Sequence, residues 1–237
     1  RTTPTLYIRR KNIDDRGMHF LIPALAHMKI LKGMDIRNNT YGTEGAAKLV
    51  ELLEKYSTIQ TFNTIPLYQL QTAVQLDISN KQLTDGDMMV IGEFLKRNKN
   101  LVALDACINN FGEDGATVIG EIIKTNTLQK LNLLQNRVGD EGISTIAKAM
   151  ETNHTMEELD VSCNQIEVDS AKALSHMIRM HPSLKVMNLS GNRLGDEGGI
   201  VIATAIEKNN RLQELNLNDN GITLEGAKSM METLHGH

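Results

Sequence analysis

The stretch Leu128-Gln-Lys-Leu131-Asn-Leu133-Leu-Gln-Asn136-Arg-Val-Gly-Asp-Glu-Gly142 decides the fold of this 237-residue chain, because it is the clearest copy of a phrase that recurs along the whole sequence. Successive copies start 28, 28, 14, 28, 27, 28, 28 and 28 residues apart. A fixed period of this length is the signature of a repeat architecture, in which each repeat forms one supersecondary unit. The nine copies begin at Thr3, Leu31, Ile59, Ala73, Leu101, Leu128, Met156, Leu184 and Leu212.

Each full copy has the pattern of a short strand, a tight bend and a return helix. Leu131 and Leu133 are separated by one polar residue, which predicts a strand with one buried face. Asn136 follows, and its side chain can bond backbone groups that a tight bend leaves unpaired. Beyond the bend, apolar residues at helical spacing predict an amphipathic helix, here Ile143, Ile146, Ala147 and Met150.

One such unit is too small to bury its own apolar face. Its few apolar side chains cannot offset the conformational entropy lost when about 28 residues become ordered. Neighbouring units must therefore stack side by side, so we expect parallel strands along the inner curve of an arc and helices outside it.

The string L-x-x-L-x-L-x-x-N, followed by a turn such as Val138-Gly-Asp-Glu-Gly142 and a helical return, resembles the ribonuclease-inhibitor-like subclass of leucine-rich repeat proteins. The resemblance covers essentially the whole chain. It implies an α/β solenoid, or horseshoe, with a parallel β-sheet on the concave face and helices on the convex face. Members of the subclass are mostly intracellular and mostly bind other proteins, so a cytoplasmic protein with a protein partner is expected. The fold does not identify that partner.

Composition is consistent with one repeat domain that spans residues 1–237. The net charge of −4 argues against nucleic-acid binding, which normally requires a basic excess, and no apolar run is long enough for a membrane span. Cys107 and Cys163 lie two units apart, so their Cα atoms are expected about 10 Å from each other, too far for a disulfide. Neither end of the chain carries the polar cap that solenoids need, which predicts a fragment of a longer protein.

The repeat is interrupted between residues 59 and 72. This copy is only 14 residues long and is expected to lack a helix. The simpler interpretation is a loop that lets the arc absorb an irregular unit. The alternative is a flexure or a partner contact on the convex side, where the missing helix would leave a notch beside Tyr68.

The outward-facing residues of the strands form columns that give the candidate binding surface. A mildly acidic column is expected to dock a partner, and a basic end with Arg9 and Arg37 is expected to help steer it. Asp77 and Asp105, about 5 Å apart, could share a proton or a cation, although a solvated polar face is the simpler interpretation. The candidate residues are Tyr7, Arg9, Asp35, Arg37, Asp77, Asp105, Asn132, Asp160, Asn188 and Asn216.

No motif in the sequence predicts catalysis, a cofactor or a metal. The seven histidines show no H-E-x-x-H or Cys/His ligand spacing, and phosphate-binding and nucleophile-elbow glycine motifs are absent. Pairs such as Asp140-Glu141 lie where negative charge stabilises a helix N-terminus, which is a structural role.

The leading hypothesis is therefore a non-catalytic scaffold that binds a partner protein on its concave strand face. A GTPase activator resembling the Ran activator is the alternative from another class, and Arg9, Arg10 and Arg37 would then be the residues to test. The sensor arm of a NOD-like receptor and a cytoskeletal or axonemal scaffold are also compatible with the resemblance.

Overall fold

The computed structural model describes residues 4–55, 58–125 and 128–235, so only the predicted start at Thr3 lies outside the described residues. Every predicted copy contributes a strand that begins two residues after the start of its phrase, and the irregular copy contributes a second one. The strands are β1 (Thr5–Tyr7), β2 (Gly33–Asp35), β3 (Thr61–Phe62), β4 (Ile65–Pro66), β5 (Gln75–Asp77), β6 (Ala103–Asp105), β7 (Lys130–Asn132), β8 (Glu158–Asp160), β9 (Val186–Asn188) and β10 (Glu214–Asn216).

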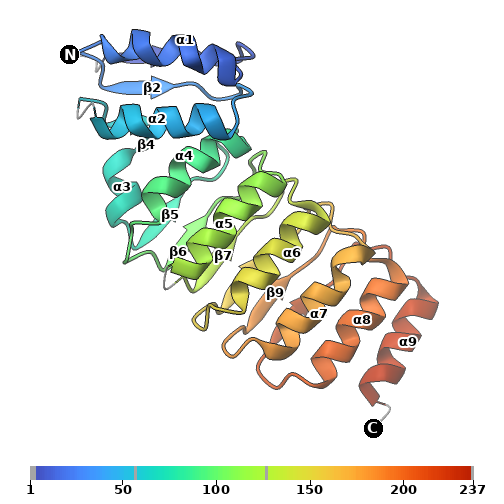
Figure 1. Ribbon diagram of the computed structural model, residues 1–237. Coiled ribbons are helices and arrows are strands. Elements are labelled where there is room, and N and C mark those ends of the chain that lie inside the picture. The colour runs from blue at the N-terminus through green and yellow to red at the C-terminus, as the bar shows by residue number, and fades with distance from the viewer. Residues whose placement is uncertain (1–3, 56–57, 126–127, 236–237) are drawn as a thin grey trace.

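A return helix follows the strand in every full-length unit, as predicted. Figure 1 shows these helices side by side along the stack, with the two termini at opposite ends. None of the helices in the described part of the chain is long and apolar enough to cross a membrane. The helices are α1 (Asp15–Ala26), α2 (Thr43–Lys55), α3 (Leu67–Thr72), α4 (Asp85–Leu95), α5 (Glu113–Thr125), α6 (Gly139–Met150), α7 (Ala171–Met180), α8 (Gly195–Glu207) and α9 (Leu224–His235).

Apart from β4, the strands pair in parallel, and their register follows the sequence period. In the six-stranded sheet β10-β9-β8-β7-β6-β5, Leu104 is paired with Leu131, Leu131 with Leu159, and Leu159 with Met187. Strands lie about 4.8 Å apart whereas packed helices lie about 8–10 Å apart, so the stack must curve with its strands inside. The predicted α/β solenoid with a concave parallel sheet and convex helices is confirmed.

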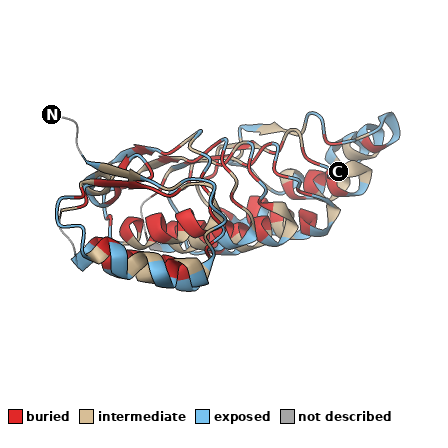
Figure 2. Cartoon of the chain, turned by 90° about the horizontal axis from the view of Figure 1, so that it is seen from above, coloured by how far each residue is buried: buried red, intermediate tan, exposed pale blue. Residues whose placement is uncertain are grey.

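The core lies between the strands and the helices. Leu131 on β7, Leu133 just after it, and Ile143 and Ile146 on α6 are all at most 2% exposed, as the alternation and the helical spacing predict. Figure 2 shows the buried residues concentrated where the two layers face each other. One contiguous apolar cluster extends from Met18 to Ala205, so each unit is stabilised by its neighbours.

In six of the units, the Asn that follows the strand bonds to the preceding unit as well as to its own bend. Asn164 is fully buried; its Oδ1 accepts the Val138 N–H at 3.3 Å, and its Nδ2 donates to the carbonyls of Leu133 at 2.8 Å and Ser162 at 2.9 Å. These side chains therefore replace backbone hydrogen bonds that the bends cannot make. Equivalent contacts are made by Asn39, Asn109, Asn136, Asn192 and Asn220.

The irregular copy at 59–72 divides the strands into two sheets. It folds into an antiparallel hairpin, β3 and β4, in which Phe62 is paired with Ile65, and this hairpin closes the four-stranded sheet β1-β2-β3-β4. The expectation that this copy lacks a helix is wrong, because α3 supplies a six-residue helix. Leu70 on α3 is fully buried, so even this short helix fills the convex layer.

A buried polar network holds the two sheets together at the break. The carboxylate of Asp87 on α4 is fully buried and accepts hydrogen bonds from the Tyr41 hydroxyl at 2.6 Å and from the Asn63 side chain. Its second oxygen accepts the Thr84 N–H at 2.9 Å and the Thr84 hydroxyl at 3.0 Å. Burial raises the pKa of the Asp87 carboxyl, and the hydrogen bonds from Tyr41, Thr84 and Asn63 oppose that effect.

A second set of bonds crosses the same break at the strand ends. The Arg37 guanidinium donates to the Lys81 carbonyl at 3.0 Å, and the Asn38 and Arg10 side chains donate to Gln82 at 2.7 and 3.3 Å. The stack is thus continuous in side-chain contacts although its sheet is interrupted.

Candidate functional site

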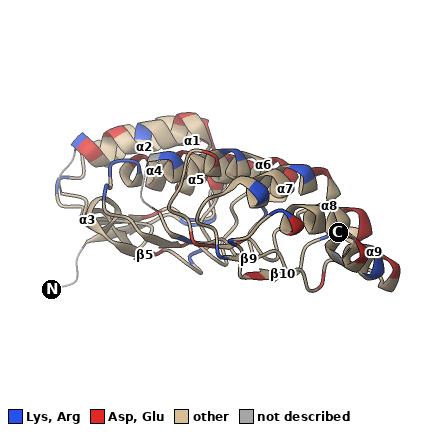
Figure 3. Ribbon diagram, turned by 90° about the horizontal axis from the view of Figure 1, so that it is seen from below, with Lys and Arg blue, Asp and Glu red and all other residues tan. Residues whose placement is uncertain are grey.

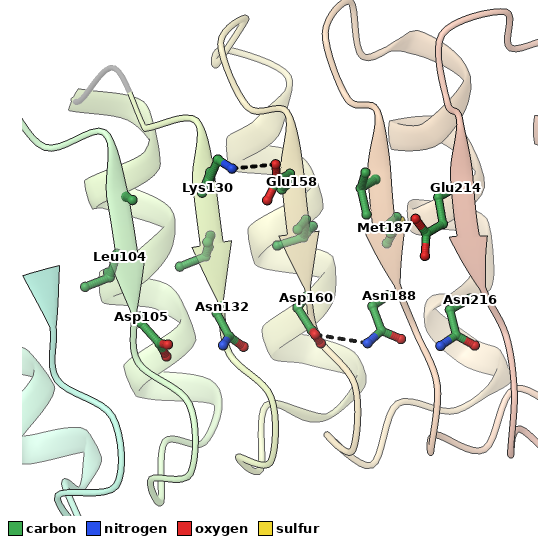
Figure 4. Close-up of a pocket in the computed structure, with 14 residues that line it drawn as sticks. Leu104, Asp105, Lys130, Asn132, Glu158, Asp160, Met187, Asn188, Glu214 and Asn216 are labelled. Atoms are coloured by element: carbon green, nitrogen blue, oxygen red, sulfur yellow. Dashed lines mark hydrogen bonds and ion pairs between the residues drawn. The ribbon is translucent and has the colours of Figure 1, made fainter. Parts of the chain in front are cut away.

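The candidate surface is the strand face of β6 to β10, where the side chains of successive units stand in a row. Figure 4 shows Asp105, Asn132, Asp160, Asn188 and Asn216 at corresponding positions of neighbouring strands. They line a shallow groove of about 410 Å³. We call these five residues, together with the residue paired with Asp105 on β5, the Asx row: Asp77, Asp105, Asn132, Asp160, Asn188 and Asn216.

Each member of the Asx row makes the same local bond. The side-chain oxygen of residue i accepts the backbone N–H of residue i+2, at 3.0 Å for Asp105, 3.0 Å for Asn132 and 2.9 Å for Asp160. The corresponding distance is 2.8 Å for Asp77, 3.1 Å for Asn188 and 3.0 Å for Asn216. Because Asp and Asn both supply this oxygen, the bend needs the oxygen and does not need the negative charge.

Asp77 is the carboxylate of the row whose pKa is shifted by its own bend. Hydrogen bonds from Ser79 lower the pKa of Asp77, which favours the ionised form of this carboxyl. Among the described residues, no group of three or more His, Cys, Asp or Glu side chains could hold a metal ion.

A second row of side chains lies on the same strands, two residues before each member of the Asx row. Lys130 and Glu158 form an ion pair at 2.6 Å across β7 and β8, and Glu214 follows on β10. Asp160 accepts a hydrogen bond from Asn188 at 2.9 Å, a contact drawn in Figure 4. The groove is therefore lined by more carboxylates than cations, and the cation Lys130 is already paired with Glu158.

The four candidate residues near the N-terminus belong to the other sheet, and they pair with each other. Asp35 is 1% exposed and accepts hydrogen bonds from Arg9 and from Arg37, the latter at 2.7 Å. Burial alone would raise the pKa of the Asp35 carboxyl, but the bonds from Arg37 and Arg9 outweigh it and hold that pKa below its usual range. The Arg9 guanidinium also stacks over the Tyr7 ring at 5.5 Å.

The structure thus divides the predicted column into two parts. Asn63, which follows β3 in the hairpin, is fully buried and interrupts the row between Asp35 and Asp77. The six residues of the Asx row lie on one sheet, and Tyr7, Arg9, Asp35 and Arg37 lie on the other.

Charged residues of both signs are mixed on the convex helices, but net charge differs between the N-terminal and C-terminal parts of the chain. On the convex helices, acidic and basic residues are interspersed (Figure 3), and many of them pair, as Lys48 does with Glu44 at 2.6 Å. Along the chain, residues 1–72 hold ten Lys and Arg against six Asp and Glu, and residues 73–237 hold fifteen against twenty-three. The two parts therefore carry net charges of +4 and −8.

A second hollow, of about 440 Å³, lies on the convex side at the irregular unit. Tyr68 is 66% exposed at its edge, and an ion pair between Glu54 and Arg97 contributes to its wall. The hollow lies where the sequence predicts a notch, and a partner contact there stays a prediction.

The two cysteines are free thiols. Cys163 is exposed, and Cys107 is 9% exposed beside the Asx row. Burial, together with the neighbouring Asp105, raises the pKa of the Cys107 thiol to about 11, so this thiol is protonated and unreactive at neutral pH.

Comparison with known proteins identifies four repeats in the C-terminal half of the chain. A family model described as Leucine Rich repeat matches residues 124–147, 152–175, 181–203 and 208–231. No curated protein matches the chain.

Several solved structures are similar to this chain at low identity. A tropomodulin C-terminal domain from Caenorhabditis elegans is 15% identical, with a TM-score of 0.44 over 71% of this chain and 88% of that chain. The actin-binding site 2 of leiomodin-1 is 16% identical, with a TM-score of 0.45 over 71% and 84% of the two chains. An internalin from Listeria monocytogenes is 16% identical, with a TM-score of 0.45 over 87% and 67%. Similarities of this size do not assign a partner.

Proposed function

Since this chain is a leucine-rich repeat protein, we propose that it is a non-catalytic scaffold that docks a partner protein along the concave face of β5 to β10. Repeat stacks of this kind offer extended concave surfaces for binding. The groove of about 410 Å³ over β6 to β10 supports this location, as do the polar side chains of the Asx row.

The proposal rests on the negative charge of the three aspartates in the Asx row, because the bends that these residues form do not require that charge. Asn132, Asn188 and Asn216 make the same bend bond as Asp77, Asp105 and Asp160. Asparagine would therefore satisfy the bend at every position, and aspartate adds a negative charge that the bend does not use. At Asp160 the second carboxylate oxygen also accepts a hydrogen bond from the Asn188 side chain, which Asp160→Asn would lose. Together with Glu214, these carboxylates favour a partner that carries a basic segment, because complementary charge steers association and sets specificity.

The test removes charge and keeps the bends intact. In the triple variant Asp77→Asn, Asp105→Asn and Asp160→Asn, each residue retains the oxygen that accepts the i+2 N–H. The matched control removes three exposed carboxylates from the convex helices α2, α6 and α9, through Glu51→Gln, Glu141→Gln and Glu232→Gln. Both variants change the net charge by the same amount.

Affinity capture from a lysate of the source cells, read by quantitative mass spectrometry, compares the two variants with the wild type. We expect at least one protein captured by the wild type to fall about tenfold with the Asx-row variant and to stay unchanged with the control. Unchanged capture by the Asx-row variant would move the interface away from this face.

Arg9 and Arg37 are poor candidates for an arginine that activates a GTPase. Both are ion-paired with Asp35, and the Arg37 side chain is only 14% exposed and also bonded to Lys81. A single-turnover assay with small GTPases is expected to show no stimulation of GTP hydrolysis by the wild-type protein.

We also propose that residues 1–237 form one repeat domain of the ribonuclease-inhibitor-like subclass. The period of 27 to 28 residues and the helix in each full unit support the subclass. The bonds from Asp87 and Arg37 across the irregular unit support a single domain. The two free thiols support a reducing, cytoplasmic location.

A further inference from the structure

Three carboxylates in the concave groove have no cation of this chain as a partner. Asp105 on β6 and Asp160 on β8 are half-buried, Glu214 on β10 is exposed, and all three line the groove drawn in Figure 4. No Lys, Arg or His in the described part of the chain forms an ion pair with any of them. Lys130, which also lines the groove, is already paired with Glu158. The groove therefore holds three negative charges without a counter-charge.

These three carboxylates lie on every second strand of the sheet. β7 separates β6 from β8, and β9 separates β8 from β10, so neighbouring charges are about 10 Å apart along the stack. Glu214 lies two residues before the Asx-row position of its strand, which moves it sideways by roughly 6.6 Å. Asp105 and Glu214, at the two ends, are therefore about 20 Å apart. A partner that pairs with all three must present cations on one face at intervals of about 10 Å.

An α-helix provides this spacing. Residues i, i+7 and i+14 of a helix lie on one face, and they are separated by about 10.5 Å and 21 Å. In an extended strand, residues i and i+3 are about 10 Å apart but point to opposite sides. A polyproline helix repeats every three residues at about 9.3 Å, but it presents a single narrow row. Since Asp160 and Glu214 lie in two rows about 6.6 Å apart, the broader face of an α-helix matches them better.

The open side of the sheet also favours a helix as its cover. Parallel sheets normally carry helices on both faces, but here the helices cover only the convex side of the strands (Figure 2). Because the open face is polar, a helix that covers it must present cations instead of an apolar stripe. Ala103 and Val186 are half-buried and line the same groove, so the methylene stems of Lys or Arg can pack on them.

We propose that the concave face takes a basic α-helix of the partner, which crosses β6 to β10 and presents Lys or Arg at positions i, i+7 and i+14. The cation at i pairs with Asp105, the one at i+7 with Asp160, and the one at i+14 with Glu214. This inference rests on the proposed function, because it specifies the kind of segment that the docking face binds.

The experiment measures the binding of three labelled synthetic peptides by fluorescence anisotropy at low ionic strength. The matched helix is an Ala- and Gln-rich peptide with Arg at i, i+7 and i+14. The rotated helix has the same composition with Arg at i, i+5 and i+10, which places the three cations on different faces. The third peptide is a polyproline helix with Arg at every third residue. We expect the matched helix to bind about fivefold more tightly than either of the others, and the difference to disappear at about 1 M salt.

Two double variants test which carboxylates recognise the helix. Asp105→Asn with Glu214→Gln removes the charges at both ends of the line and keeps the oxygen that the bend of residue 105 needs. In this variant the matched and the rotated helix should bind within about twofold of each other. The control Glu51→Gln with Glu141→Gln removes two exposed charges from the convex helices and should leave the preference of the wild type unchanged.

The proposal would be overturned by equal binding of the matched and rotated helices, by tighter binding of the polyproline peptide, or by no binding of the matched helix at millimolar concentration. These measurements need no natural partner. If one of these results accompanied a loss of lysate capture by the Asx-row variant, the docking face would stand and only the helical segment would be rejected.

Discussion

At the scale of single residues, this solenoid is stabilised by side chains that act on a neighbouring unit. Asn164 bonds to Val138 and Leu133 of the preceding unit, and Asp85 accepts N–H groups from the following one. Since these polar groups are buried or half-buried, losing one leaves its partners without hydrogen bonds. Such residues are therefore expected to affect stability more than their size suggests.

The six Asn residues that bond to the preceding unit, which we call the Asn ladder, give the first prediction. Asn164→Ala removes the partners of three backbone groups, so the free energy of unfolding should fall by about 2–4 kcal/mol. Urea unfolding followed by circular dichroism measures the change. The control Asn218→Ala, at an exposed position after β10, should alter the free energy by less than about 0.5 kcal/mol. Equal effects of the two variants would contradict the role of the ladder.

The buried network at the break gives the second prediction. Asp87→Asn replaces one acceptor oxygen with a donor that must face either Thr84 or the Tyr41 and Asn63 pair. We expect the free energy of unfolding to fall by about 2–4 kcal/mol, and by only about 1 kcal/mol for Tyr41→Phe, which removes a single donor. Chemical denaturation of both variants checks the order, and an Asp87→Asn variant as stable as the wild type would rule out the network as a stabilising element.

Sequence reasoning predicts the residues whose role repeats and misses those whose role is unique. The Asn that follows the strand was predicted because six units share it. The burial of Asp35 and Asn63 was missed, since both occupy positions that face solvent in other units. The capping of α4 by Thr84 and Asp87 could be predicted from their spacing of three residues. The bonds from Tyr41 and Asn63 to Asp87 could not, because these residues meet only when the units stack.

At the scale of elements, helix starts are linked to one another along the stack. Asp85 in the first turn of α4 accepts the N–H groups of Gly112 at 2.7 Å and Gly115 at 2.9 Å, at the start of α5. Asp15 makes the same two bonds to Gly42 and Gly45 at the start of α2. An aspartate in one helix thereby caps the next helix, so the first turns of neighbouring helices are aligned.

This link gives the third prediction. Asp85→Ala leaves two N–H groups at the start of α5 without acceptors and should lower the free energy of unfolding by about 1–2 kcal/mol. Amide exchange should rise most in residues 112–118. Asp114→Ala, an exposed change in the first turn of α5, is expected to cost at most about 0.5 kcal/mol, through the helix dipole alone. Faster exchange in α4 but not in α5 would contradict the link.

The irregular unit shows where element prediction from the sequence ends. The interruption at 59–72 is visible in the spacing, and the expected absence of a helix followed from its length of 14 residues. The structure accommodates α3 because the hairpin turn at Asn63 and Thr64, both with positive φ, reverses the chain within two residues. That turn leaves six residues for one short helix.

At the scale of the whole molecule, the period alone predicted the solenoid, the parallel register and the inner position of the strands. It also placed the six residues of the Asx row on adjacent strands, because a constant period puts equivalent residues opposite each other. It could not predict that the sheet is split at β4 and β5, which separates the basic end from the acidic face. The division of charge into +4 and −8 parts follows the same boundary.

The central claim is that the concave face of β5 to β10 is the docking surface, and carboxyl footprinting tests it most directly. Carbodiimide labelling is measured by mass spectrometry with and without the partner obtained by affinity capture. Bound partner should reduce the labelling of Asp105, Asp160 and Glu214 several-fold and leave that of Glu51 and Glu141 on the convex helices unchanged. Protection of the convex carboxylates, with the concave ones still fully labelled, would contradict the account.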